Sequence, residues 1–165
     1  MAKIVKSKST ILAVVVSLVV LVSLAWPHCQ APCGIYNDQM RFDMITEHIA
    51  TIEKSIKQIT EMSAEPKPNM NQIVRWVNNK DEHADEIAEI VSYYFMAQRI
   101  ALPDKADPKA AAPYVQKLTL LHEMLVYSMK TKQTTDPANV EKLRSVLDSF
   151  HHAYFGQAQA AEHKQ

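Results

Sequence analysis

Glycine is almost absent from this chain, which has only two in 165 residues, Gly34 and Gly156. Hairpin-rich sheets need glycine at many turns, so this scarcity argues against an all-β fold and favours helices. Cysteine is equally rare, and Cys29 and Cys33 are too few for a disulfide scaffold. Neither sign of charge is in excess, because 18 Lys and Arg balance 18 Asp and Glu. We therefore expect no nucleic-acid partner.

The first 27 residues have the order of a secretory signal peptide, in which a basic segment precedes an apolar one. Residues 1–10 contain lysines and no acid, and residues 11–26 are almost wholly apolar. As a helix, the apolar segment spans about 24 Å, less than the roughly 30 Å hydrocarbon core of a bilayer. We expect export to the periplasm or the extracellular space, with a processing protease cutting after Pro27. The alternative is a membrane anchor formed by residues 11–26, because proline directly before a cut fits a signal-peptidase site poorly.

Four stretches beyond this segment carry apolar residues at spacings of three and four, as amphipathic helices do. They cover about residues 39–62, 70–98, 110–130 and 137–154. Asp107 and Asp136, each followed by proline, are typical N-caps of the third and fourth stretches. The alternative for the third is a regular helix that starts at Pro113, since that proline lies beyond the first turn of a helix capped by Asp107. The pattern predicts an all-α fold, an antiparallel up-and-down four-helix bundle over residues 37–155, with a frayed tail over 156–165.

The chemically unusual stretch is residues 28–36, HCQAPCGIY, between the signal-like segment and the first helix. Cleavage ahead of His28 would give that residue a free α-amine. The amine, the amide nitrogen and thiolate of Cys29, and the thiolate of Cys33 then form a plane of two nitrogens and two sulfurs, with the His28 imidazole above it. A planar site favours Ni(II), whereas zinc prefers a tetrahedral one. Thiolates and an anionic amide also stabilise Ni(III), which predicts one-electron chemistry.

The same stretch follows the pattern His-Cys-x-x-Pro-Cys-Gly-x-Tyr, and it resembles the nickel hook of the nickel superoxide dismutases. The resemblance implies an antioxidant enzyme, an oxidoreductase that converts superoxide to dioxygen and hydrogen peroxide through a Ni(III)/Ni(II) cycle, with one nickel ion in each subunit. It implies that His28, Cys29 and Cys33 bind the metal and that Tyr36 limits access to its open axial face. It also implies a homohexamer of four-helix bundles, each preceded by an N-terminal metal hook.

Outside the hook, the resemblance extends to three further residues of the site. Asp43 stands where the family has an acid that bonds the axial imidazole, although its side chain is shorter than the family's glutamate. His83 stands where the family has a basic partner for that acid. Tyr94, in a YYF run, stands where the family has a second tyrosine near the metal. With Tyr36, these residues form the expected catalytic set.

Simpler interpretations of the same residues are open. Cys29 and Cys33 in an exported chain can form a short disulfide. The bundle can also be a non-enzymatic nickel- or copper-binding protein, exported or membrane-anchored, which needs the thiols but no free amine. Asp43 can be an ordinary acid of a first helical turn, and His83 a solvent-facing residue. None of the seven histidines follows a glutamate by three residues, which excludes the di-iron pattern of some four-helix bundles.

Overall fold

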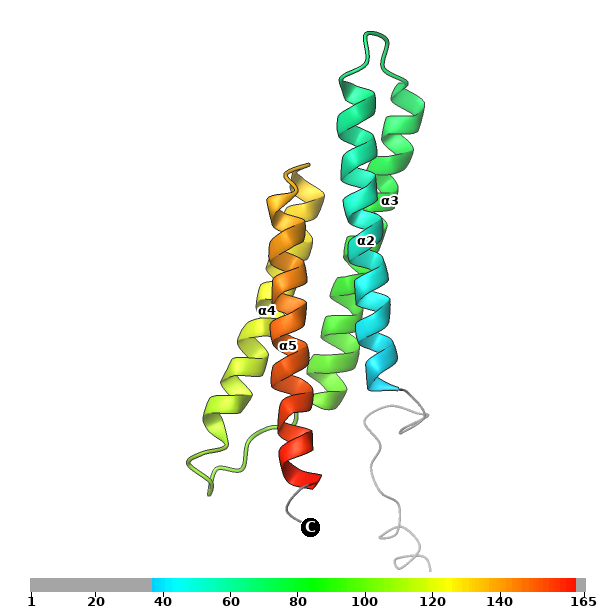
Figure 1. Ribbon diagram of the computed structural model, residues 1–165. Helices are drawn as coiled ribbons and strands as arrows, with labels where there is room; N and C mark the ends of the chain where they lie inside the picture. The colour runs from blue at the N-terminus through cyan, green and yellow to red at the C-terminus, as the bar shows by residue number, and fades with distance from the viewer. Residues whose placement is uncertain (1–36, 163–165) are drawn as a thin grey trace, which may run out of the picture. The chain divides into compact units, whose positions relative to one another are not determined.

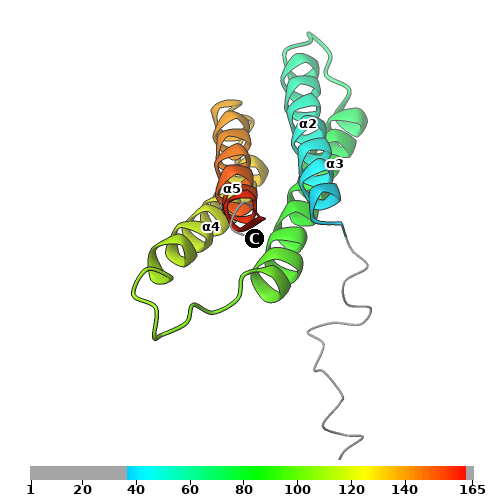
Figure 2. The same ribbon diagram turned by 60° about the horizontal axis from the view of Figure 1, so that its bottom comes forward.

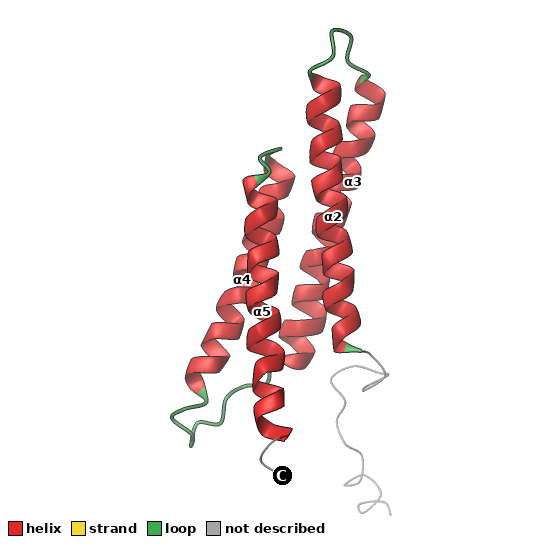
Figure 3. Cartoon of the chain, viewed as in Figure 1, coloured by secondary structure: helices red, strands yellow, loops and turns green. Residues whose placement is uncertain are grey.

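The structure is a computed structural model that describes the backbone of residues 37–162 and the side chains of residues 37–156. Within that range the chain forms four helices joined by loops, with no strand (Figures 1 and 3). The helices are α2 (Asp38–Ser63), α3 (Met70–Glu89) with its continuation η1 (Ile90–Arg99), α4 (Ala111–Gln133) and α5 (Ala138–Glu162). The predicted all-α four-helix fold is confirmed, whereas the predicted signal-like segment 1–27 and hook 28–36 lie outside the described residues.

Successive helices run in opposite directions, as the colours from cyan to red show in Figure 1. α2 packs against α3 and α5, and α4 packs against α3 and α5, so each helix has two neighbours in the bundle (Figure 2). The beginning of α2 and the end of α5 are therefore at the same end of the bundle as the end of η1. Residue 37 follows the hook directly, so this end of the bundle is the one to which the hook is joined.

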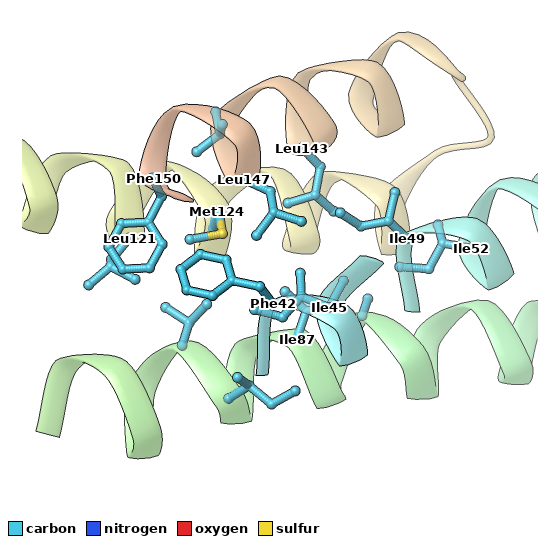
Figure 4. Packing of buried hydrophobic residues seen from close by; sticks show 14 of the residues in the cluster. Phe42, Ile45, Ile49, Ile52, Ile87, Leu121, Met124, Leu143, Leu147 and Phe150 are labelled. Atoms are coloured by element: carbon cyan, nitrogen blue, oxygen red, sulfur yellow. The ribbon is translucent and has the colours of Figure 1, made fainter. Parts of the chain in front are cut away.

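The core is built from the apolar stripes of all four helices (Figure 4). α2 contributes isoleucines at the predicted spacing, and they are almost fully buried. Burying each such side chain stabilises the fold by about 1.5–3 kcal/mol. The residues labelled in Figure 4 are Phe42, Ile45, Ile49, Ile52, Ile87, Leu121, Met124, Leu143, Leu147 and Phe150.

At the hook end of the bundle the core is aromatic. The ring of Phe42 lies 4.9 Å from that of Phe95 and 5.4 Å from that of Phe150, measured between centroids. It also lies 5.7 Å from the ring of Tyr154. These spacings are typical of favourable ring pairs, each worth about 0.5–1.5 kcal/mol beyond burial. Rings from three helices, α2, η1 and α5, thus form a packed aromatic layer at this end of the bundle, hereafter called the aromatic layer.

The inward face of α4 differs from the one that apolar spacing predicts. Met129 follows Leu125 by four residues and so continues the apolar spacing of the predicted stretch 110–130, yet it is 52% exposed, whereas Ser128 and Thr131 are buried. The Ser128 hydroxyl donates to the main-chain oxygen of Ala84 at 3.1 Å, and the Thr131 hydroxyl donates to the oxygen of Ser128 at 2.7 Å. Both buried hydroxyls are thus satisfied on main-chain oxygens, and the Ser128 bond joins α4 to α3.

Lys80 is the unexpected buried charge of the bundle. It lies in the polar run 78–82, a pattern typical of a solvated face, yet it is only 2% exposed. Its Nζ donates to the main-chain oxygens of Thr131 and Lys132, at 2.6 and 2.8 Å, and to Asp81 Oδ1 at 2.8 Å. These oxygens belong to the last turn of α4, which lacks intrahelical donors for them. Lys80 therefore caps the end of α4 from the neighbouring helix.

The predicted helix ends differ in detail from those observed. Asp136 caps α5 as expected, since its Oδ1 accepts from the Ala138 amide at 2.9 Å. Asp107 instead caps a separate turn, in which its Oδ1 accepts from the Lys109 amide at 2.8 Å, and α4 begins only at Ala111. α5 continues through Gly156 to Glu162, because the residues after that glycine include several alanines, which are strong helix formers.

Candidate active site

The end of the second long helix is wound as a π-helix, η1, which spans Ile90–Arg99. In an α-helix, residues five apart point about 140° away from each other. The wider i→i+5 winding, seen in the 3.0 Å bond from the Ile100 amide to the Phe95 oxygen, brings such residues onto one side. Tyr94 and Arg99 are related in this way: Arg99 Nη2 donates to the Tyr94 hydroxyl at 3.0 Å, and the guanidinium carbon lies 4.8 Å from the ring centroid.

These two side chains converge on Asp38, the first residue of α2. Arg99 Nε donates to Asp38 Oδ1 at 2.9 Å, and the Tyr94 hydroxyl donates to the same oxygen. From α5, the Tyr154 hydroxyl donates to Asp38 Oδ2 at 2.8 Å. Asp38, Tyr94, Arg99 and Tyr154 are hereafter called the Asp38 cluster. It joins three helices through one carboxylate, which also lies favourably at a helix N-terminus.

The surroundings of the cluster fix its protonation state. Burial alone would raise the pKa of Asp38, but the bonds from Tyr94 and Tyr154 and the charge of Arg99 outweigh it and lower that pKa. Burial raises the pKa of Tyr94, and the bond to Asp38 adds to the rise. The pKa of Tyr154 is raised for the same two reasons. At neutral pH the carboxylate is therefore charged, and both tyrosines are neutral hydrogen-bond donors.

The chain ties this cluster closely to the hook. Asp38 follows Tyr36 by two residues and Cys33 by five. The residue at the centre of the cluster is thus the second one after the end of the hook motif. Tyr94, expected near the metal, donates to this residue, and its proximity to the metal stays a prediction. Sequence reasoning missed Asp38, Arg99 and Tyr154, since only Asp38 is near the motif and it resembles an ordinary acid of a first helical turn.

Asp43 and His83 are not brought together by the described residues. Asp43 is exposed and accepts from Gln39 Nε2 at 2.9 Å. His83 is bonded to His48, with the two Nδ1 atoms 2.7 Å apart. The predicted acid–base pair of Asp43 and His83 is therefore absent from this part of the chain, and His83 is not simply solvent-facing. Any contact of either residue with the hook lies outside the described residues.

The His48–His83 pair bridges α2 and α3 halfway along the bundle. Its short Nδ1–Nδ1 distance requires one ring to donate and the other to accept. Burial lowers the pKa of His48, and the nearby His83 lowers it further. His48 Nε2 is buried and has no hydrogen-bond partner among the described residues. The pair is thus arranged for a neutral His48 that shares a single bond across the helices.

Metal-binding chemistry is concentrated in the hook rather than in the bundle. The described side chains of residues 37–156 contain no group of three or more His, Cys, Asp or Glu positioned to hold a metal ion. The hook supplies two thiols, an imidazole and, once trimmed, an amine, a donor set that suits nickel in a planar site. Among the described helices, none has both the length and the apolar character needed to cross a membrane.

A helical bundle joined to a sulfur-rich N-terminal segment defines the class as a helical metalloprotein. The model of a protein family described as nickel-containing superoxide dismutase matches residues 23–158, well over half of the chain. The match includes the whole hook motif and runs from there into α5. The chain belongs to this family, and it is therefore an oxidoreductase that uses nickel and acts on superoxide. Searches of curated proteins and of solved structures find no match to it.

Proposed function

We propose that the chain disproportionates superoxide through a Ni(III)/Ni(II) couple held by His28, Cys29 and Cys33. In one half of the cycle a superoxide gives up an electron and leaves as dioxygen. In the other half a second superoxide takes up one electron and two protons and leaves as hydrogen peroxide. The observation that carries the proposal is the family match, which contains every fixed position of the hook motif.

The ligand set depends on maturation of the chain. His28 can offer its α-amine only after a protease cuts behind Pro27, so residues 1–27 are proposed to direct export and then to be removed. The mature enzyme then works outside the cytoplasm, in the periplasm or the extracellular space. We take it to be a homohexamer, as the family resemblance implies.

The protein's own residues serve to position protons and to limit access. Tyr36, the last residue of the hook motif, would limit access to the metal to small anions. Tyr94 keeps its proton at neutral pH, since burial and the bond to Asp38 raise its pKa, and Arg99 fixes the position of its hydroxyl. Together the two tyrosines order the water that supplies protons to the departing peroxide. Bracing of the His28 imidazole by Asp43 or His83 stays a prediction.

The test compares two proteins that differ at the amino end alone. One begins at His28 and the other keeps Pro27 ahead of it, so both have the same thiols and imidazole but only the first has the free amine at His28. Each protein is loaded with nickel under anaerobic conditions. It is then assayed for superoxide removal, and electron paramagnetic resonance is used to detect a rhombic Ni(III) signal. We expect activity and the signal only from the protein that begins at His28.

Other outcomes separate the alternatives. Equal activity of the two proteins would show that the amine is not a ligand. Tight nickel binding without superoxide removal would support a non-enzymatic nickel protein instead. Mass spectrometry of protein recovered from cells making the full chain reports the natural amino end, and a chain that still contains residues 11–26 would support the membrane anchor.

A further inference from the structure

A pocket of about 330 Å³ lies between the end of η1 and the start of α4. Its lining contains two cationic side chains, Arg99 and Lys117, and no acidic one. The rest of the wall is apolar or aromatic, from residues such as Ile100, Pro113 and Tyr114. We call this feature the Arg99–Lys117 pocket. The volume exceeds that of a few water molecules, at about 30 Å³ each, so it has room for a small ion together with part of its hydration shell.

Lys117 is a cation that lacks an anionic partner in the described part of the chain. Its ammonium lies 5.8 Å from the centroid of the Tyr154 ring, a cation–π contact, and no salt bridge involves it there. Burial lowers the pKa of Lys117, because a half-buried ammonium without a carboxylate is poorly solvated. A small anion in the pocket would relieve that cost.

Arg99 provides the second cation and the link to the active site. Its Nε bonds Asp38 and its Nη2 bonds Tyr94, so in the described residues Nη1 keeps its donors available on a side chain that lines the pocket. Counting Arg99 and Lys117 as +1 each and Asp38 as −1 leaves a net charge of +1. An anion bound at Arg99 would therefore be one side chain away from the Tyr94 hydroxyl.

We propose that the Arg99–Lys117 pocket is a binding site for small inorganic anions that collects superoxide beside the Asp38 cluster. This inference rests on the proposed function, since it gives that reaction an approach for its substrate. The body of the chain is slightly acidic once residues 1–27 are removed, with 15 Lys and Arg against 18 Asp and Glu. A local cationic pocket raises the concentration of an anionic substrate that the rest of the surface does not attract.

Azide is the probe, because it is a small monoanion that does not disproportionate. Its binding is measured by calorimetry at constant ionic strength, on mature protein with and without nickel. Lys117→Met removes the cation and keeps most of the side-chain volume, Lys117→Arg restores the charge, and Lys109→Met removes the same charge from an exposed position on the adjacent loop. We expect Lys117→Met to weaken azide binding by about fivefold or more, with the other two variants within about twofold of wild type.

The same variants are then compared in the superoxide assay. We expect kcat/KM of Lys117→Met to fall by about threefold to tenfold and to depend less steeply on salt, as steering by a local charge requires. In the wild type, NMR should place azide at the pocket through shifts of the Ala101 and Tyr114 amide signals, a result that needs no variant.

Three results would overturn the inference: unchanged azide affinity in Lys117→Met, azide binding that appears only with nickel present, or amide shifts confined to other regions. Failure of the proposed function is separately visible. A protein that binds azide at the pocket but removes no superoxide contradicts the function alone, and an active protein indifferent to Lys117→Met contradicts the pocket alone.

Discussion

The Asp38 carboxylate connects three helices at the hook end of the bundle. Asp38→Asn removes its negative charge and keeps the size and shape of the side chain. Asp38 accepts bonds from Tyr94, Tyr154 and Arg99. An asparagine has only one oxygen acceptor, and its amide group faces a donor where the second oxygen was. Hydrogen bonds to charged groups contribute about 1.5–3 kcal/mol each. The Asp38 side chain is 31% exposed, which weakens its electrostatics. We expect Asp38→Asn to lower the free energy of unfolding by about 1–3 kcal/mol.

For a chain of this length, about 1 kcal/mol corresponds to roughly 4 °C in melting temperature. Thermal unfolding followed by circular dichroism at pH 7 should therefore show Asp38→Asn melting about 4–12 °C below the wild type. The matched control is Asp43→Asn, since Asp43 is an exposed acid on the next turn of α2 and accepts a hydrogen bond from Gln39. We expect that control to melt within about 2 °C of the wild type.

The pH dependence gives a second check with a definite sign. The fold lowers the pKa of Asp38 below its unfolded value of about 3.9. The carboxylate therefore stabilises the fold fully above that unfolded pKa and loses its contribution as pH falls through the folded-state pKa. The melting difference between wild type and Asp38→Asn should be constant from pH 7 to 5 and shrink below about pH 4. A variant as stable as the wild type, or a difference that persists in acid, would refute this account of the cluster.

Three other perturbations test the bundle. Lys80→Met removes the donor that caps the end of α4, so urea unfolding should show a loss of about 2–5 kcal/mol, against little change for the exposed Lys67→Met. Burial lowers the pKa of His48 in the fold, so the free energy of unfolding should fall as pH drops from about 7.5 to 5.5. His48→Gln should make the melting temperature less dependent on pH over this range. Equal pH dependence of the melting temperature in wild type and variant would contradict this account. Phe42→Ala leaves a cavity at the centre of the aromatic layer and should lower the free energy of unfolding in urea by about 3–5 kcal/mol. Met40→Ala, at an exposed position, should lower it by less than about 0.5 kcal/mol.

The helices could be predicted from sequence because their signal is local and repeated. Ile45, Ile49 and Ile52 recur at helical spacing, and each lies in the core as that spacing requires. The pattern was less reliable for α4, where Met129 continues the apolar repeat but Ser128 is buried in its place. A hydroxyl that donates to a main-chain oxygen can be buried as readily as a methyl group. A search for apolar spacing therefore does not find buried serine or threonine residues of this kind.

The hook and its supports differ in how far apart their residues lie in the chain. The proposed ligands His28, Cys29 and Cys33 lie so close together that their spacing alone suggests a chelate. The Asp38 cluster draws on residues that lie 56, 61 and 116 positions after Asp38, and no short motif links them. Lys80 is similar, because its partners lie 51 and 52 positions away. Such contacts follow from the packing of the helices, which the hydrophobic pattern does not specify in detail.

The winding of η1 makes the number of residues in that segment matter as much as their identity. Removing one residue between Phe95 and Arg99 would allow the segment to relax into an ordinary α-helix, whose turn closes one position earlier. The arginine would then follow Tyr94 by four residues, about 40° away around the helix axis, so it would stay on the side that faces Asp38. Relatives that are one residue shorter here should thus keep the cation beside this carboxylate on an ordinary α-helix. Relatives of the same length with ordinary α-winding should instead carry it about 140° away, or recruit it from another helix.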